Sequence, residues 1–219
     1  MGFVDDILAV SKCGYPAVKA NAIINSFIES KKLEFGQTKC HQLHVGEYNG
    51  ICPTLKVHGK IMEKKVQQKY LGDIISADGK NTLNFKSRSN RAYSIISEIL
   101  AILREVPLGK YELTAGLRLR EAMFINGILT NSEVWYGIKH EEIQILQEAD
   151  EYLLRKLLKA HSKTAKECLY LETGTLPVKY IIMSRRLNYL HHIITRDNDE
   201  LISRVYVAQK RKPVKDDWV

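Results

Sequence analysis

The chain opens with Met1-Gly2-Phe3-Val4-Asp5-Asp6-Ile7-Leu8-Ala9-Val10-Ser11, a pair of aspartates between two short apolar runs. Apolar, β-prone runs that flank a tight polar turn are typical of a β-hairpin. The sequence therefore predicts that Asp5 and Asp6 lie at a hairpin tip. Because the first arm of this hairpin is so short, we expect the chain to be part of a longer protein.

After this hairpin the pattern of apolar and polar residues changes twice along the chain. Apolar residues at helical spacing predict a helix over Tyr15–Ser30. Short alternating runs separated by glycines predict strands between Leu33 and Ile75. The rest is helical in pattern, with helices predicted over residues 84–106, 111–130, 141–160, 179–195 and 199–209. We expect an α+β part over residues 1–76 and an all-α bundle over residues 77–219, because the composition shifts near residues 76–82.

Composition, net charge and cysteine content already favour some classes of protein and partner over others. The 219 residues are 45% hydrophobic and 26% charged, as in ordinary globular domains. A net charge of +8 favours a polyanionic partner such as nucleic acid. Four scattered cysteines without a CxxC pair favour a reduced intracellular protein, in the cytoplasm or nucleus. There is neither a signal peptide nor an apolar run of about 20 residues, so no membrane partner is expected.

The aspartate pair has two readings when it is taken by itself. Carboxylates are the ligands that Mg²⁺ prefers, and two-metal phosphoryl transfer uses them to hold the attacking and leaving oxygens in line. Aspartates are equally ordinary residues of tight turns. The surrounding sequence therefore has to decide between a catalytic and a purely structural pair.

Three motifs follow one another in an order that resembles the reverse transcriptases of non-LTR (LINE-type) retrotransposons. Phe3-Val4-Asp5-Asp6 precedes an apolar strand and a helix, and Leu33-Glu34-Phe35-Gly36-Gln37-Thr38-Lys39-Cys40 follows that helix. Tyr70-Leu71-Gly72-Asp73-Ile74-Ile75-Ser76 then looks like the primer-grip hairpin of that family. The helical part is similar to the family's post-thumb region in Leu171–Pro177, Arg185–Leu190 and Asp217-Trp218, so the resemblance covers nearly the whole chain.

The resemblance implies a partial polymerase palm over residues 1–76, made of short antiparallel strands and one helix, followed by a helical thumb and post-thumb region. It implies RNA-directed DNA polymerase activity, a metal-dependent nucleotidyl transfer with Mg²⁺ as cofactor and Mn²⁺ as a possible substitute. The implied partners are an RNA template, a DNA primer and, in the full enzyme, dNTPs. The oligomeric state and the template preference stay open.

The resemblance also assigns roles to single residues. Asp5 is the expected main metal ligand, with Asp6 as its neighbour, and Lys39 is expected beside the incoming triphosphate. Expected contacts to the primer come from Phe3, Val4, Tyr70, Leu71 and Gly72. Expected contacts to duplex phosphates come from Lys86, Arg88, Arg91, Arg118 and Arg120.

The family's two-metal site needs a further aspartate from an upstream strand, and none precedes Met1 in this chain. We therefore expect the chain by itself to be inactive as a polymerase. The alternative function is a non-catalytic nucleic-acid-binding remnant that holds a template–primer duplex. A structural remnant without any partner is a third possibility.

Two further groups of residues have competing readings. Cys40-His41, His44 and Cys52 suggest zinc, yet their spacing matches no standard finger, and packed or exposed residues are the favoured reading. Trp135-Tyr136 suggest stacking on a base, although core packing between helices is favoured because large aromatics usually fill cores.

Overall fold

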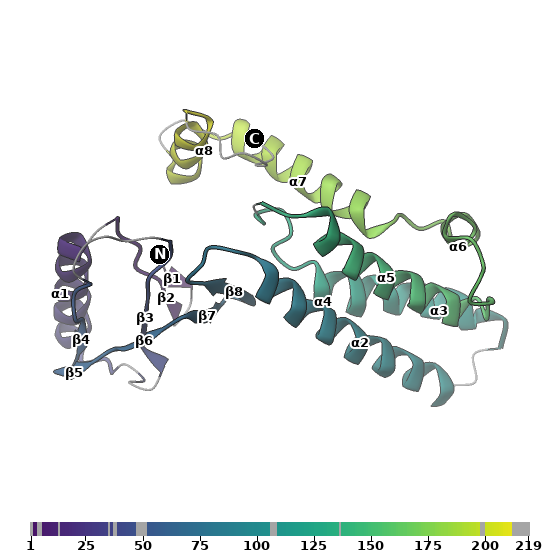
Figure 1. Cartoon of the computed structure of the whole chain (residues 1–219), viewed down its shortest axis with the longest axis horizontal. Coiled ribbons are helices and arrows are strands. Elements are labelled where there is room, and N and C mark those ends of the chain that lie inside the picture. Colours follow the sequence, from purple (N-terminus) through teal and green to yellow (C-terminus); the bar gives the residue numbers. More distant parts are fainter. Residues whose placement is uncertain are drawn as a thin grey trace. The chain divides into compact units, whose positions relative to one another are not determined.

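The structure is a computed structural model that describes residues 2–3, 6–12, 14–34, 36, 39–46, 52–105, 109–135, 137–197 and 200–211. It is a mostly helical α+β protein in which short strands near the N-terminus precede a run of helices (Figure 1). The chain forms two compact units, Met1–Lys80 and Asn81–Val219. The division falls within the composition shift predicted near residues 76–82.

Most strands of the first unit are paired as antiparallel hairpins. Strand β1 (Gly2–Phe3) pairs with β2 (Asp6–Ile7), β4 (Lys56–Val57) with β5 (Lys60–Ile61), and β7 (Gln67–Tyr70) with β8 (Asp73–Ser76). The β4–β5 and β7–β8 connections are short turns, which permit antiparallel pairing.

Strand β3 (His41–Leu43) pairs with β6 (Glu63–Lys65) in the parallel sense. The expectation of antiparallel strands throughout is therefore wrong for this pair. The β4–β5 hairpin lies between the two strands in the chain, and this longer connection allows β6 to run in the same direction as β3.

Helix α1 (Gly14–Ser30) matches the helix predicted for this region. The side-chain amides of Asn21 and Asn25 both donate to the carbonyl oxygen of Lys56, each at 2.9 Å, and so attach the helix to β4. Among the described residues of this unit, the buried apolar side chains are Ile28 and Val57. The described core of the first unit is therefore small.

The second unit consists of helical segments. These are α2 (Thr82–Glu105), the 3-10 turn η2 (Gly109–Tyr111), α3 (Glu112–Leu119), the π-helical segment η3 (Arg120–Ile125), α4 (Asn126–Ile128), α5 (His140–Leu157), α6 (Lys166–Thr173), α7 (Val178–Ile194) and α8 (Leu201–Arg211). The predicted helices agree with these segments to within a few residues, and α3, η3 and α4 together occupy the helix predicted over 111–130. Helix α6 was not predicted.

Helix α5 is the central element of this unit, because it contacts α2, α3, α6 and α7 (Figure 1). Glu142 fixes its start by accepting a hydrogen bond from the backbone N–H of Lys139 at 3.1 Å, as an acidic residue in a first helical turn often does. Side chains buried in the core include Phe85, Ile96, Ile99, Phe124, Ile125, Leu146, Leu153 and Val178. No helix in the described part of the chain is long and apolar enough to cross a membrane.

Candidate nucleic-acid interface

The aspartate pair lies in a hairpin whose backbone is described only in part. Phe3 and Asp6 are opposite each other in the β1–β2 pair, and Val4 and Asp5 fall outside the described residues. The side chains of Phe3 and Asp6 are likewise outside the description. Among the described residues, no three His, Cys, Asp or Glu side chains gather into a group suited to a metal ion. The carboxylate groups of the expected Mg²⁺ ligands, Asp5 and Asp6, therefore lie outside the described part of the structure.

The Tyr70-Leu71-Gly72 segment forms the tip of a hairpin, as predicted. Tyr70 is opposite Asp73, and Leu71 and Gly72 have φ angles of 46° and 93°. Positive φ at both central residues is the requirement of a type I′ turn, whose twist matches that of the flanking strands. The Leu71 side chain is 41% exposed at this tip. Lys39, which is expected beside the incoming triphosphate, is also exposed.

The first half of α2 carries an exposed polar face. Lys86 and Arg91 are exposed on it, while Phe85, Ala92 and Ile96 are buried on the opposite side. Residues 82–97 contain no Asp or Glu, and Ser87, Asn90 and Ser94 fill the exposed positions between the cations. Lys, Arg, Ser and Asn side chains are the groups that contact phosphate oxygens in nucleic-acid complexes. Arg118 is likewise exposed, on α3.

Arg88 is directed inward from the same helix. Its side chain is 5% exposed, its Nη1 donates to the carbonyl oxygen of Ile128 at 2.7 Å, and its guanidinium lies 4.6 Å from the ring centre of Trp135. Trp135 itself is 4% exposed and packs edge-on against Phe85. The favoured reading of Trp135 as a core residue is confirmed, and Arg88 is a core cation that links α2 to the end of α4.

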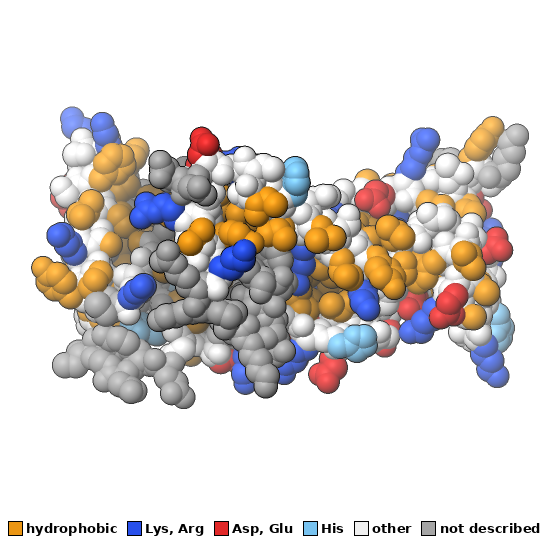
Figure 2. All heavy atoms as spheres, turned by 90° about the horizontal axis from the view of Figure 1, so that it is seen from above, with side chains coloured by type: hydrophobic (Ala, Val, Ile, Leu, Met, Phe, Trp, Pro, Cys, Tyr) orange, Lys and Arg blue, Asp and Glu red, His pale blue; other side chains and the backbone are white. Residues whose placement is uncertain are grey.

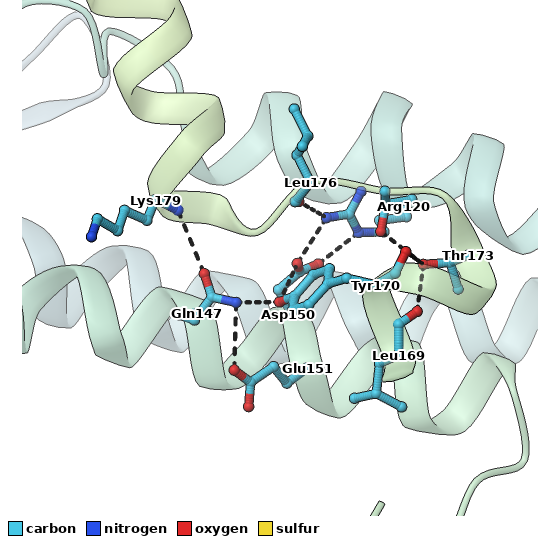
Figure 3. Close-up of polar contacts among 10 residues, drawn as sticks. Arg120, Gln147, Asp150, Glu151, Leu169, Tyr170, Thr173, Leu176 and Lys179 are labelled. Carbon is cyan, nitrogen blue, oxygen red and sulfur yellow. Dashed lines mark hydrogen bonds and ion pairs between the residues drawn. The ribbon is translucent and has the colours of Figure 1, made fainter. Parts of the chain in front are cut away.

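Arg120 is buried more deeply and is paired. Its Nε and Nη2 atoms lie 2.6 and 2.7 Å from the two carboxylate oxygens of Asp150, and the two side chains are 2% and 0% exposed (Figure 3). Nη2 also donates to the carbonyl oxygen of Leu176 at 3.2 Å. This is a bidentate, charge-assisted pair, the strongest common form of an Arg–carboxylate contact. Burial therefore removes Arg88 and Arg120 from the surface available to phosphates, which leaves Lys86, Arg91 and Arg118.

A network of polar side chains extends from the Arg120–Asp150 pair. The Tyr170 hydroxyl lies 3.3 Å from Asp150, and the Gln147 amide donates to both Tyr170 and Glu151 (Figure 3). The backbone N–H of Lys179 donates to the Gln147 side-chain oxygen at 3.5 Å. Through these bonds the network joins η3, α5, α6 and the start of α7.

The surroundings of the network shift the proton affinities of its members. Burial raises the pKa of the Asp150 carboxyl, and the Arg120 guanidinium acts in the opposite direction. Burial, together with the Asp150 and Glu151 carboxylates, raises the pKa of the Tyr170 hydroxyl. Desolvation thus acts on both groups, as expected for polar residues inside a helical core.

The network was missed at the level of sequence, although one signal pointed to it. Leu146, Leu153 and Leu157 form an apolar stripe, and Asp150 occupies the position between Leu146 and Leu153 in the same register. A carboxylate in an apolar stripe requires a buried partner, because an unpaired buried charge is very costly.

The residues considered as zinc ligands make contacts with different partners. Cys52 Sγ lies 2.6 Å from His44 Nε2, and the Gln42 amide lies 3.0 Å from the same His44 nitrogen. His41 Nδ1 lies 3.6 Å from a carboxylate oxygen of Glu63. The described geometry thus brings His44 and Cys52 together and places His41 beside an acid.

Comparisons of this chain with protein-family models, curated proteins and solved structures gave no match. The observations define the chain as a mostly helical α+β protein with an exposed basic face at the start of α2.

Proposed function

We propose that this chain is a portion of an RNA-directed DNA polymerase of the non-LTR retrotransposon type, in which it holds the template–primer duplex. The observation that carries the proposal is the exposed face of α2, where Lys86 and Arg91 stand among small polar side chains with no carboxylate over residues 82–97. In the chain, this face follows directly on the Tyr70-Leu71-Gly72 hairpin that resembles a primer grip.

In the proposed complex, Lys86, Arg91 and Arg118 neutralise phosphates along the duplex backbone. Such contacts release condensed counterions, so the affinity falls steeply with salt and depends little on base sequence. The exposed Leu71 at the β7–β8 tip supplies an apolar contact to the primer strand. The first unit then corresponds to part of a polymerase palm and the second to a helical thumb.

The chemistry assigned to the aspartate pair is metal-dependent nucleotidyl transfer. Asp5 and Asp6 supply carboxylate oxygens, and Mg²⁺ bound there would neutralise the charge that develops on the triphosphate. One such pair carries too little negative charge to hold two divalent ions firmly. We therefore expect the 219-residue chain to bind duplex without extending a primer by itself.

A salt titration tests the binding role. Fluorescence anisotropy of a labelled RNA–DNA duplex, measured across about 50–200 mM salt, should show affinity that falls as salt rises. Lys86→Ala, Arg91→Ala and Arg118→Ala should each weaken binding and reduce the salt slope by about 1. The control is Lys163→Ala, an exposed lysine outside the proposed contact set. Absence of binding at the lowest salt would contradict the proposal.

A second experiment separates the polymerase reading from a non-catalytic duplex-binding remnant. Fe²⁺ substituted for Mg²⁺ and supplied with hydrogen peroxide is oxidised to Fe³⁺ and releases hydroxide and a hydroxyl radical, which cleaves nucleic acid beside the bound ion. Cleavage centred on the primer 3′ end, lost in the Asp5→Asn/Asp6→Asn variant while duplex binding is kept, supports the metal assignment. Binding without localised cleavage favours the remnant, and robust primer extension by the isolated chain contradicts the expected inactivity.

A further inference from the structure

Helix α7 packs against α5 and α8, and its apolar side chains fall into a buried and an exposed set. Val178, Ile182 and Ile193 are buried, with exposed fractions of 0%, 2% and 6%. A second set of apolar side chains lies elsewhere on the helix and is open to solvent: Tyr180 at 51%, Met183 at 49%, Leu187 at 64% and Ile194 at 59%. A helix that is apolar on more than one face normally has a packing partner on each.

The exposed set has the spacing of a helix–helix interface. Tyr180, Met183, Leu187, the half-buried Leu190 and Ile194 are separated by three, four, three and four residues, and together they are called the α7 stripe below. This alternation is the heptad pattern that meets another helix along a narrow seam. The stripe runs for roughly 21 Å at 1.5 Å per residue. Figure 2 shows apolar side chains gathered in a band on this face of the molecule.

The charges beside the stripe indicate the chemistry of the occupant. The positions that flank a heptad seam are taken here by Lys179, Ser184, Arg186 and His191, and α7 contains no Asp or Glu. Of these, Lys179 and His191 are exposed, whereas Arg186 is half-buried and donates to the carbonyl oxygen of Trp135. Residues at such flanking positions choose the partner by charge. Two copies of α7 could form no ion pair across the seam in either orientation, because the helix offers no carboxylate to its basic side chains. A helix with carboxylates beside its own apolar seam is complementary.

We propose that the α7 stripe is the docking site for an acidic amphipathic helix of another protein. This inference does not depend on the proposed polymerase role. Tyr180, Leu187 and Ile194 insert between the partner's apolar side chains, and Lys179 and His191 lie next to the partner's glutamates. Because α7 is already ordered by its contacts with α5, the partner alone has to lose conformational freedom on binding.

The test uses a designed three-heptad peptide with leucines in the seam and glutamates at the flanking positions. Fluorescence anisotropy with the full chain should give a Kd on the order of 10 µM, a typical strength for a short helix in a groove. A peptide with lysines in place of the glutamates should bind at least tenfold more weakly.

Matched variants localise the site. Leu187→Glu should weaken binding of the glutamate peptide at least tenfold, and its helical circular dichroism should be unchanged because Leu187 is 64% exposed. Leu171→Glu is the control, since Leu171 is 80% exposed on α6 and lies outside the stripe. Equal binding of the two peptides, or equal effects of the two variants, would overturn the proposal.

Two other occupants of the α7 stripe would give distinct experimental outcomes. A dimer in sedimentation velocity that Leu187→Glu dissociates would show that a second copy of this chain covers the stripe. Sedimentation with phosphatidylserine-containing vesicles that the same variant abolishes would show a lipid surface instead. Either result overturns the docking of an acidic helix.

Discussion

At the scale of single residues, Asp150 is a buried carboxylate with two polar partners, Arg120 and Tyr170. It is fully buried in a register otherwise occupied by leucines, and its charge is balanced by Arg120 at 2.6 Å. Removing one partner of such a pair leaves an uncompensated charge in the core, whereas removing both leaves an apolar site. The pair is therefore expected to matter more for folding than for ligand binding.

This gives a prediction for a double-mutant cycle. Arg120→Met and Asp150→Leu should each lower the free energy of unfolding by about 3–5 kcal/mol, and the double variant should lose much less than the sum. Urea denaturation followed by circular dichroism measures the three values. The control is Glu112→Gln in the exposed Lys159–Glu112 pair, which should cost about 1 kcal/mol or less. Additive losses would refute the coupling.

Tyr170 provides a prediction for alkaline pH. Its pKa is raised in the folded chain, so its neutral form is favoured there. The stability that it contributes is complete below the unfolded-state pKa of about 10 and is lost as pH rises above that value. The difference in unfolding free energy between wild type and Tyr170→Phe should therefore fall above about pH 10. Tyr111→Phe, at a side chain that is 60% exposed, serves as the control, and a flat difference for Tyr170 would contradict the prediction.

The arginines show that the direction and partner of a basic side chain could not be predicted from the sequence. Lys86, Arg88 and Arg91 are neighbours in one helix, and the family resemblance assigned all of them to contacts with a duplex. The inward direction of Arg88 depends on Trp135 and Ile128, which are distant in the sequence and meet α2 only in the folded unit. The Asp150 position in the apolar stripe was visible in the sequence, but its partner Arg120 was not, because that pairing is tertiary.

At the scale of elements, sequence patterns located the long helices, since local spacing determines them, whereas the β7–β8 hairpin was expected from the family resemblance. They failed for α6, an eight-residue helix with a mixed pattern of polar and apolar side chains. They also failed for the parallel β3–β6 pair. Pairing between strands separated by another hairpin depends on long-range contacts, which leave little trace in local periodicity.

The β7–β8 turn carries a conformational cost that a substitution should relieve. Leu71 has a φ of 46°, where a residue with a large side chain is strained, and Asn-Gly is the preferred pair for a type I′ turn. Leu71→Asn should stabilise the hairpin by about 0.5–1 kcal/mol, seen as slower amide hydrogen exchange in β7 and β8.

The same variant separates stability from binding. If Leu71 contacts the primer strand as proposed, Leu71→Asn should weaken duplex binding although it makes the hairpin more stable. Gly72→Ala is the opposing control, because a φ of 93° strains alanine and should speed exchange. Faster exchange in Leu71→Asn would contradict the assignment of strain to Leu71.

At the scale of the whole molecule, the two units differ in how much apolar surface they bury. The buried apolar side chains described in Met1–Lys80 are Ile28 and Val57, whereas the core of Asn81–Val219 extends from Phe85 to Ile193. Burial of apolar surface is the main favourable contribution to folding, and it increases with the size of the core. The helical unit is therefore expected to supply most of the stability of the chain.

Separate expression of the two units tests this division. The fragment 81–219 should keep its helical circular dichroism and unfold in one cooperative transition, with a Tm within about 5 °C of the full chain, which corresponds to roughly 1 kcal/mol for a unit of this size. The fragment 1–80 should unfold without a cooperative transition, because hydrogen bonds such as those of Asn21 and Asn25 to Lys56 do not replace a core. Loss of the cooperative transition in fragment 81–219 would show instead that the first unit completes the helical core.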